Sequence, residues 1–541
     1  MGVHAVMGGG WPSMRGRALA GIGAGAVSWL VPASLADEVT AAARAEADAA
    51  LAAAGERVPR RRFRALPPRL GVYLVLGLCL YSHLPCRQVL RELASGLRGA
   101  LAAAGWSVPA PTALTGLRRR LGERPFELLF WRVAGALCPG REPWSLVCGL
   151  LAVAWDGTSV KVPASPANIA AFGRPRHGGK KDKDAKTAKG AKDAKGAKAK
   201  DAEARAAEAA YPQARLVTLV ACGTRALLGA ATGPFTAGER TLAGQLTGRL
   251  ETGMLLLADR GFYSFALWNA SAAGGAHLLW RVSSTVRLPV VRALPDGSFL
   301  SRVNDPVQAQ RRSKRNCNNR RRGSSLPQET GPLPGSVTVR VIEFTVKVTL
   351  DDGTARTERY RMITTLLDWR AYPAAELAAG YARRWAIETS YREFKTYLRG
   401  PGKILRSRTP DLARQEIWAY LITCQVIRAV IAYAAAGPGL NPARLSFTAA
   451  LHAIRRTGPD GPATLNAAAE EILDQPVPER EHRVCPRAVN APSQPFPSRR
   501  GQEHPISQHA HYTLTVTRPG HTTALATDQP QQPGTRENQP P

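Results

Sequence analysis

Four side chains in the segment YARRWAIETSYREFK are spaced so that one helix would gather them on one face. Arg384, Glu388 and Lys395 follow Tyr381 at offsets of 3, 7 and 14, and at about 100° per residue all four fall within about 60° of arc. Arg392 belongs to the same stripe. A carboxylate flanked by cations and a phenol suits a site in which the carboxylate holds a metal ion while the cations grip a phosphodiester.

Two aspartates stand where apolar strands are expected to end in turns. Asp156 lies in AWDGT, and Asp259 ends the run MLLLADRGFYS. A carboxylate after a buried run is costly unless it is paired or binds a cation. Each aspartate alone is more often a turn or helix-cap residue. Combined with Glu388, three carboxylates at the edge of a sheet would hold two Mg²⁺ or Mn²⁺ ions about 4 Å apart, the arrangement that serves in-line phosphoryl displacement.

The composition favours a polyanionic partner. The chain has 541 residues with 73 Lys and Arg against 41 Asp and Glu, a net charge of +32, and neutralising phosphates drives nucleic-acid binding. Composition alone leaves DNA, RNA and an anionic membrane surface open. The eight cysteines form no CxxC pair, which argues against a zinc site or a disulfide framework.

The elements expected to position these residues begin with helices. Residues 1–35 form a leader with the outline of a signal peptide, and 36–144 a helical domain. Within this domain, a break at Gly105–Pro111 precedes Thr112–Leu121, which carries Arg118, Arg119 and Arg120. This pattern fits either a DNA-binding helix-turn-helix variant or a plain helical bundle with a basic face. The apolar run Val72–Leu80 is too short to span a bilayer, so we expect a soluble protein.

A mixed α/β sheet is expected next. Residues 145–286 read as strands that pair as a meander and then alternate with helices, interrupted by a Lys/Ala-rich insert at 176–212 that cannot build a core. Residues 287–359 read as a β-rich subdomain with an Arg-rich loop, and 360–437 as the second part of the core, including the helix of Glu388. A helical segment follows at 438–475, and a disordered tail at 476–541.

The residues named above resemble the DDE transposases of bacterial insertion sequences, specifically the insertion-sequence-4 family. The likeness covers about residues 25–475. It rests on the Asp–Asp–Glu set, the Tyr-x2-Arg-x3-Glu-x6-Lys spacing, DGT at Asp156 and ADRGFYS at Asp259. WLVP near Trp29 and LRSRTPDLARQEIWAYL belong to it as well, and the former weakens the signal-peptide interpretation.

The resemblance implies an RNase H-like core interrupted by a β-rich insertion between Asp259 and Glu388. Asp156, Asp259 and Glu388 would be the metal ligands. Tyr381, Arg384 and Lys395, with Arg392, would bind phosphates of the transposon ends. It also implies a dimer acting on paired double-stranded DNA ends and on target DNA, in the bacterial cytoplasm near the nucleoid.

Trp280 is a candidate for the aromatic residue that stacks on a flipped base in such enzymes. Because it begins a strand, packing in the core is the favoured interpretation.

Two alternative functions stay open at this stage. The lysine tract and the C-terminal tail depart from the family pattern, which is compatible with a decayed copy that only binds DNA. An RNase H-like nuclease without strand transfer would need the same carboxylates.

Overall fold

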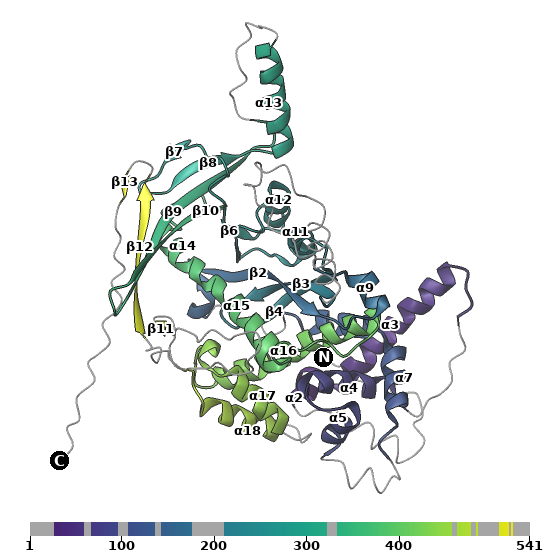
Figure 1. The fold of residues 1–541 in the computed structure, drawn as a ribbon. Helices are drawn as coiled ribbons and strands as arrows, with labels where there is room; N and C mark the ends of the chain where they lie inside the picture. Colours follow the sequence, from purple (N-terminus) through teal and green to yellow (C-terminus); the bar gives the residue numbers. More distant parts are fainter. Residues whose placement is uncertain are drawn as a thin grey trace, which may run out of the picture. The chain divides into compact units, whose positions relative to one another are not determined.

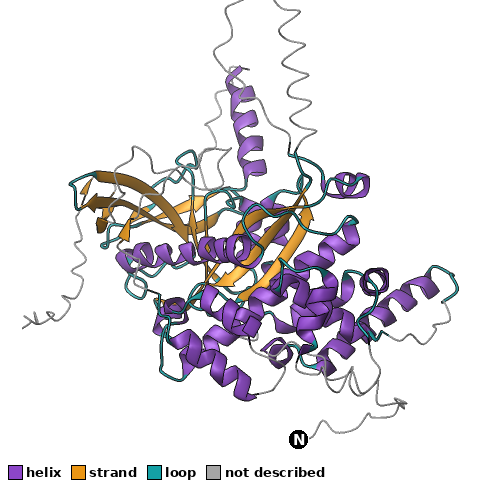
Figure 2. Cartoon of the chain, turned by 60° about the horizontal axis from the view of Figure 1, so that its bottom comes forward, coloured by secondary structure: helices purple, strands orange, loops and turns teal. Residues whose placement is uncertain are grey.

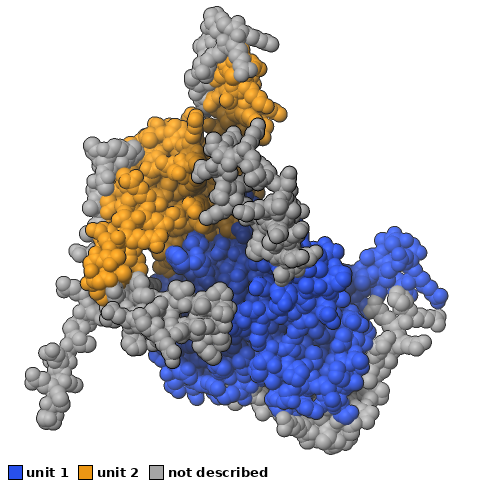
Figure 3. Space-filling view, in the orientation of Figure 1, with its two compact units in different colours: residues 1–146, 152–249, 384–477 blue, residues 147–151, 250–383, 478–541 orange. Residues whose placement is uncertain are grey.

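The computed structural model describes residues 26–58, 66–95, 107–135, 142–175, 210–321, 333–456, 462–477, 483–484, 508–518 and 521–522. The chain divides into two compact units (Figure 3). Unit 1 comprises residues 1–146, 152–249 and 384–477, and unit 2 comprises residues 147–151, 250–383 and 478–541. The leader up to residue 25 and residues 176–209 of the Lys/Ala-rich insert lie outside the described residues.

Unit 1 begins with helices, as predicted for its N-terminal part. These are α2 (Ala26–Leu30), α3 (Ala33–Ala53), α4 (Pro68–Leu80), α5 (Cys86–Leu93), α7 (Pro111–Leu121) and α8 (Arg124–Val133). Proline at the first position of α4 and of α7 presets φ where no helical N–H bond is needed. The apolar run predicted to be too short for a membrane is α4, which is buried from Leu70 to Leu80.

The helix α7 carries the three consecutive arginines, and their surroundings differ. Arg118 is buried, and its guanidinium donates to Gln415 Oε1 at 3.2 Å and to Ser407 Oγ at 2.9 Å. Arg119 and Arg120 are exposed. Arg118 is therefore a structural residue, which corrects its place in the predicted basic face.

Unit 1 also contains an antiparallel meander. Its strands are β2 (Leu150–Lys161), which enters unit 1 at Ala152, β3 (Gln213–Ala221) and β4 (Leu227–Pro234). Asp156 of β2 pairs with Thr218 of β3, and a turn at Cys222–Thr224 joins β3 to β4. Two helices contact these strands: α9 (Pro166–Phe172) contacts β4, and α11 (Glu239–Gly244) contacts β3 and β4. The 3-10 turn η3 (Thr247–Arg249) follows α11.

The remaining helices of unit 1 pack around α16 (Pro410–Ala436), which contacts α4, α8, α17 (Phe447–Arg456) and α18 (Pro462–Leu473) (Figures 1 and 2). The short turn η6 (Pro442–Arg444) precedes α17. By length and composition α16 could cross a bilayer, but 83% of its most apolar window is buried inside the protein. Its packing is that of a core helix.

Unit 2 contains a mixed sheet in the strand order β11-β12-β9-β10-β6-β5. The strands are β5 (Met254–Ala258), β6 (His277–Arg281), β9 (Val337–Leu350), β10 (Ala355–Thr364), β11 (Arg483–Val484) and β12 (Gln508–Arg518). The β5–β6 pair is parallel, whereas β10 pairs with β6 and β9 antiparallel. The short strands β7 (Arg292–Ala293), β8 (Phe299–Val303) and β13 (His521–Thr522) and the helices α12 (Phe265–Ala272) and α14 (Ala374–Gly380) complete it.

Two predictions fail in unit 2. The segment expected as an Arg-rich loop begins as the helix α13 (Pro306–Arg321), which extends away from β7 and β8 (Figure 1). The tail expected to be disordered contains β12, which pairs antiparallel with β9 from Ala510↔Leu350 to Val516↔Phe344. Composition concealed this strand, because Gln, His and Pro dominate the tail while the stretch from Ala510 to Val516 alternates apolar and β-branched residues.

Unit 2 is held together internally by a buried arginine of β9. Arg340 is fully buried and donates from Nε to Ser298 Oγ at 2.8 Å and from Nη1 to the Tyr372 carbonyl at 2.6 Å. Its Nη2 pairs with Asp296. Satisfying several donors of one guanidinium is what makes a buried arginine tolerable.

Candidate active site

Asp156 lies where β2 leaves the core. Residues 152–155 are fully buried, whereas Asp156 is half-buried and its Oδ1 accepts a hydrogen bond of 2.8 Å from the N–H of Gly157. Burial raises the pKa of this carboxyl to about 6. That N–H and the charge of Arg384 oppose the rise, while the charges of Glu388 and Glu239 add to it. A cation next to Asp156 would lower this pKa and favour the ionised carboxylate.

The segment predicted as one continuous α-helix is built from three kinds of helix. A 3-10 turn, η4 (Tyr381–Arg384), leads into the α-helix α15 (Trp385–Arg392) and then into the π-helix η5 (Glu393–Leu398). Since 3-10 and π turns rotate by different angles per residue, the calculated arc of about 60° holds only within the α-helical part. Ile387 and Phe394 of this segment are buried in the core.

Glu388 is paired with Arg384 one turn before it. Nη2 of Arg384 lies 2.8 Å from Oε1 of Glu388, and the side chains are 11% and 36% exposed. Arg384 also acts on Asp156, whose pKa its charge lowers. One guanidinium thus partly neutralises the two carboxylates that unit 1 contributes. The guanidinium carbon of Arg384 lies 5.6 Å from the centroid of the Trp385 ring. The Trp385 residue is 60% exposed.

Tyr391 connects the helix of Glu388 with the strand of Asp156. Its hydroxyl donates to the Asp156 carbonyl at 2.6 Å and accepts from the N–H and the hydroxyl of Thr218 at 3.2 and 2.9 Å. Burial raises the pKa of the phenol, so it stays protonated. Because Asp156 and Thr218 are opposite each other in the sheet, the hydroxyl bridges the two strands at the position of the catalytic candidate.

The cations after Glu388 differ in exposure. Lys395 is half-buried, and burial and the charge of Arg399 lower its pKa, while the charge of Asp156 raises it. Arg392 is exposed, and its charge helps to lower the pKa of Arg225. Lys395 therefore lies within electrostatic range of Asp156, whereas Arg392 lies near Arg225 in the turn between β3 and β4.

Unit 2 contains the remaining candidate site residues, Asp259, Tyr381 and Trp280. Asp259 follows the fully buried end of β5, and its Oδ1 is buried without a hydrogen-bond partner among the described residues. Tyr381 is 6% exposed, and its hydroxyl donates to the carbonyl of Ala258 at 3.1 Å. Tyr381 is thus fixed beside Asp259 rather than displayed on an exposed stripe, which corrects its predicted surroundings.

Trp280 occupies a core position. It is fully buried in β6, and its ring packs edge-to-face on Trp268 with centroids 5.3 Å apart. The favoured interpretation of Trp280 as a packing residue therefore agrees with its surroundings.

Sequence reasoning missed Glu239, the first residue of α11. A Cβ on Gly157 would lie 2.4 Å from the carboxyl carbon of Glu239, so this carboxyl rests directly on the backbone next to Asp156. Its charge raises the pKa of both Asp156 and Tyr391. The only signal in the sequence is the small residue after Asp156, which leaves room for a side chain from another element.

The donor set of the predicted site consists of oxygen atoms. Carboxylates without thiols or imidazoles suit hard cations such as Mg²⁺ and Mn²⁺, and the partnerless buried oxygen of Asp259 and the raised pKa of Asp156 fit a cation nearby. Among the described residues, no three His, Cys, Asp or Glu side chains gather closely enough to hold a metal ion. All six cysteines in the described ranges are free thiols.

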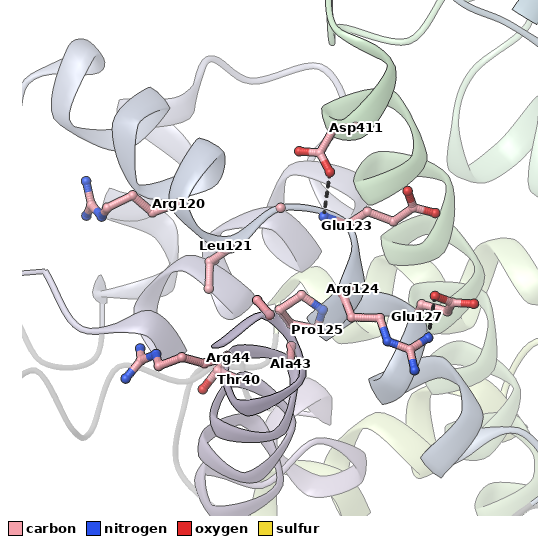
Figure 4. A pocket seen from close by; sticks show the side chains of 12 residues that line it. Thr40, Ala43, Arg44, Arg120, Leu121, Glu123, Arg124, Pro125, Glu127 and Asp411 are labelled. Carbon is pink, nitrogen blue, oxygen red and sulfur yellow. Dashed lines mark hydrogen bonds and ion pairs between the residues drawn. The ribbon is translucent and has the colours of Figure 1, made fainter. Parts of the chain in front are cut away.

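A pocket of about 440 Å³ in the N-terminal part of unit 1 holds none of the predicted site residues. Figure 4 shows it between Thr40 of α3, Arg120 of α7 and Asp411 of α16. Within its lining, Arg124 pairs with Glu127 at 2.7 Å, and Asp411 Oδ1 accepts a hydrogen bond of 3.0 Å from the N–H of Glu123. We interpret it as a recess between packed helices.

Comparisons with known proteins agree with the predicted family. Residues 33–131 match the family described as "Insertion element 4 transposase N-terminal". Residues 149–425, more than half of the chain, match "Transposase DDE domain". "Transposase InsG for insertion sequence element IS4" of Escherichia coli (strain K12) is 28% identical over 390 residues, which cover 72% of this chain and 75% of that protein.

Two further similarities are weaker. "Putative transposase InsZ" of the same strain is 27% identical over 206 residues, covering 38% of this chain and 56% of that protein. A chain of the piggyBac transposase synaptic complex with hairpin DNA superposes with a TM-score of 0.35 at 9% identity, covering 78% of this chain and 76% of that one.

The family matches and the mixed sheet carry the conclusion: this chain belongs to the insertion-sequence-4 family of DDE transposases, with an RNase H-like core and a helical N-terminal region.

Proposed function

We propose that this enzyme, a metal-dependent DNA transposase by its family, uses Asp156, Asp259 and Glu388 as its catalytic carboxylates. They would hold two Mg²⁺ or Mn²⁺ ions. When bound, such ions activate the attacking water or 3′-hydroxyl and stabilise the departing oxygen. The observation that carries this proposal is the fixed relation of Asp156 and Glu388 through Tyr391 and Arg384. The partnerless buried oxygen of Asp259 supports the third ligand.

The cationic residues would bind the phosphates of the transposon ends. Arg384 neutralises Glu388 and Asp156 in the free protein, and we propose that it shifts toward a DNA phosphate once cations take over that charge. Lys395 and Arg392 would contact neighbouring phosphates, because they follow Glu388 on the same part of unit 1. Tyr381, whose hydroxyl donates to the Ala258 carbonyl, would support the backbone before Asp259.

The wider assembly follows from the reaction. Cutting and rejoining two transposon ends requires both ends in one complex, so we propose a homodimer on paired inverted repeats in the bacterial cytoplasm. Residues 36–144 would add DNA contacts through exposed side chains such as Arg119 and Arg120. Residues 287–359, with the basic helix α13, would form the insertion domain.

The test is cleavage of a labelled fragment that carries the element's own end and flank, with Mg²⁺, Mn²⁺ or EDTA. Asp156→Asn, Asp259→Asn and Glu388→Gln should each abolish nicking and joining while a gel-shift assay shows retained end binding. Asp474→Asn, an exposed carboxylate on unit 1, should behave like the unaltered protein. Metal-dependent cleavage by any of the three variants would refute the assignment of that residue.

A further inference from the structure

Glu393, five residues after Glu388, is buried between two arginines from distant parts of unit 1. Its side chain is 8% exposed. Nη1 of Arg225, in the turn between β3 and β4, lies 2.9 Å from Oε1, and Nη2 of Arg428, in α16, pairs with Oε2. The first residue of the π-helix η5 is thereby fastened to the meander on one side and to the central helix on the other.

The cost of this triad indicates a role beyond packing. Buried ion pairs are weak contributors to stability, because the desolvation of the charges offsets their attraction. Here a buried cation, Arg428, and a largely buried one, Arg225 with 17% of its side chain exposed, share one carboxylate. Burial lowers the pKa of Arg225 to about 10, with the charge of Arg392 adding to the effect. Arg225 also adopts a φ of 58°, in the left-handed region that favours glycine. A strained turn that carries an arginine suggests that its guanidinium is needed.

The triad lies at the start of η5, which is a π-helix, a rare helical form in proteins. The N–H of Arg399 donates to the carbonyl of Phe394 at 3.1 Å, an i→i+5 bond that accommodates one more residue than an α-turn. Segments of π-helix occur mostly as single turns and often at functional sites. Relaxation to an α-helix would rotate the side chains after Glu393 around the helix axis. Lys395, in this turn, is half-buried and lies within electrostatic range of Asp156.

We propose that Glu393, Arg225 and Arg428 form a positioning clamp that holds η5 in its π-helical form and so directs Lys395 toward the DNA end bound beside Asp156. This inference rests on the proposed role of Lys395 as a phosphate ligand. The clamp residues themselves need not touch DNA, since they act through the orientation of Lys395. Their loss should therefore remove the contribution of Lys395 and no other contact.

The test is a double-mutant cycle on DNA binding. Arg225→Gln is the main variant, because it leaves a balanced Glu393–Arg428 pair and removes one excess buried cation. Arg225→Lys keeps the charge and should restore function. Glu393→Gln is the more severe variant and is used only if its thermal unfolding remains cooperative. Each is combined with Lys395→Ala, and binding to a duplex of the element's own terminal repeat is titrated with salt.

We expect Lys395→Ala to weaken end binding about tenfold and to reduce the salt slope by about 0.9. Arg225→Gln should reproduce most of this loss, and the double variant should bind no more weakly than Lys395→Ala alone. Arg456→Gln, which breaks the exposed pair with Glu471 in the same unit, serves as the matched control and should leave binding unchanged in both backgrounds.

The outcomes separate the two ideas. Suppose that Lys395→Ala weakens binding and that the double variant loses affinity by the product of the two single-variant factors. The two residues then act independently, so the clamp is overturned while the role of Lys395 stands. If Lys395→Ala leaves both the affinity and the slope unchanged, the assignment of Lys395 as a phosphate ligand is overturned, and the clamp with it.

Discussion

The hydroxyl of Tyr391 donates a hydrogen bond of 2.6 Å to the backbone carbonyl of Asp156, 235 residues earlier in the chain. The same hydroxyl accepts from the N–H of Thr218, the residue opposite Asp156 in the sheet. One half-buried phenol therefore ties the strand of Asp156 to the helix of Glu388. The geometry of two catalytic candidates depends on a residue that performs no chemistry itself.

Tyr391→Phe should lower the free energy of unfolding by about 1–3 kcal/mol, because it leaves the carbonyl of Asp156 and the N–H of Thr218 without their partner in a buried place. It should also slow end cleavage by more than this loss of stability explains. Denaturant unfolding and the cleavage assay measure the two effects. Tyr397→Phe, on an exposed tyrosine of η5, is the control and should change neither. Equal cleavage rates for the two variants would contradict the positioning role.

Asp156→Asn should stabilise the metal-free protein at pH 8. The folded-state pKa of Asp156 is raised from 3.8 to about 6, so its ionised form opposes folding above pH 6. Well below pH 3.8 it is protonated in both states and the cost vanishes. We expect a gain on the order of 3 kcal/mol at pH 8 and almost none at pH 3, measured by denaturant unfolding in EDTA at pH 8, 4 and 3. A gain of the same size at all three pH values would rule out the buried charge as its cause.

Gly157→Ala should be destabilising because its new Cβ would lie 2.4 Å from the carboxyl carbon of Glu239. Because this carboxyl is the far end of a flexible, half-buried side chain that can move aside, the expected cost is about 1 kcal/mol, the low end for overpacked sites. The double variant Gly157→Ala/Glu239→Ala removes the Glu239 carboxyl from the path of the new methyl group and should recover most of the stability. Gly244→Ala, where nothing lies within 4 Å of the new Cβ, is the control. Failure of the double variant to recover would place the strain elsewhere.

A chain that ends at residue 507 should lose stability and aggregate. It lacks β12, so the edge of β9 from Phe344 to Leu350 would be exposed with its backbone donors and acceptors unpaired. A chain that ends at Thr522 keeps the strand and serves as the control. Light scattering against concentration and thermal unfolding distinguish the two, and identical behaviour would mean that β12 adds nothing to the sheet.

Local chemistry made much of this protein predictable. The apolar runs before Asp156 and Asp259 indicated strands, and both strands form, but only β5 ends at its aspartate, whereas β2 continues past Asp156 to Lys161. The spacing from Tyr381 to Lys395 identified the family because four residue types at fixed offsets are a specific pattern. The helix from Pro410 was visible from its length, its apolar composition and its proline start.

Other features could be settled only by tertiary contacts. The segment after Glu388 has the sequence of an ordinary helix, and it becomes a π-helix where Arg225 and Arg428 hold Glu393 from distant parts of the chain. The sequence placed Arg118 on a basic surface, whereas in the structure it is buried and donates to Gln415 and Ser407. β12 is a strand because β9 offers it an edge.

The sequence by itself thus determined which residues carry the chemistry, since side-chain type and spacing are local properties. Only the tertiary structure decided which residues hold them in place: Tyr391 at Asp156, Glu239 against Gly157 and the two arginines at Glu393. The physical reason is that a hydrogen bond or an ion pair between distant segments forms only after folding has paid the entropy of bringing them together, and no local pattern records which segments will meet.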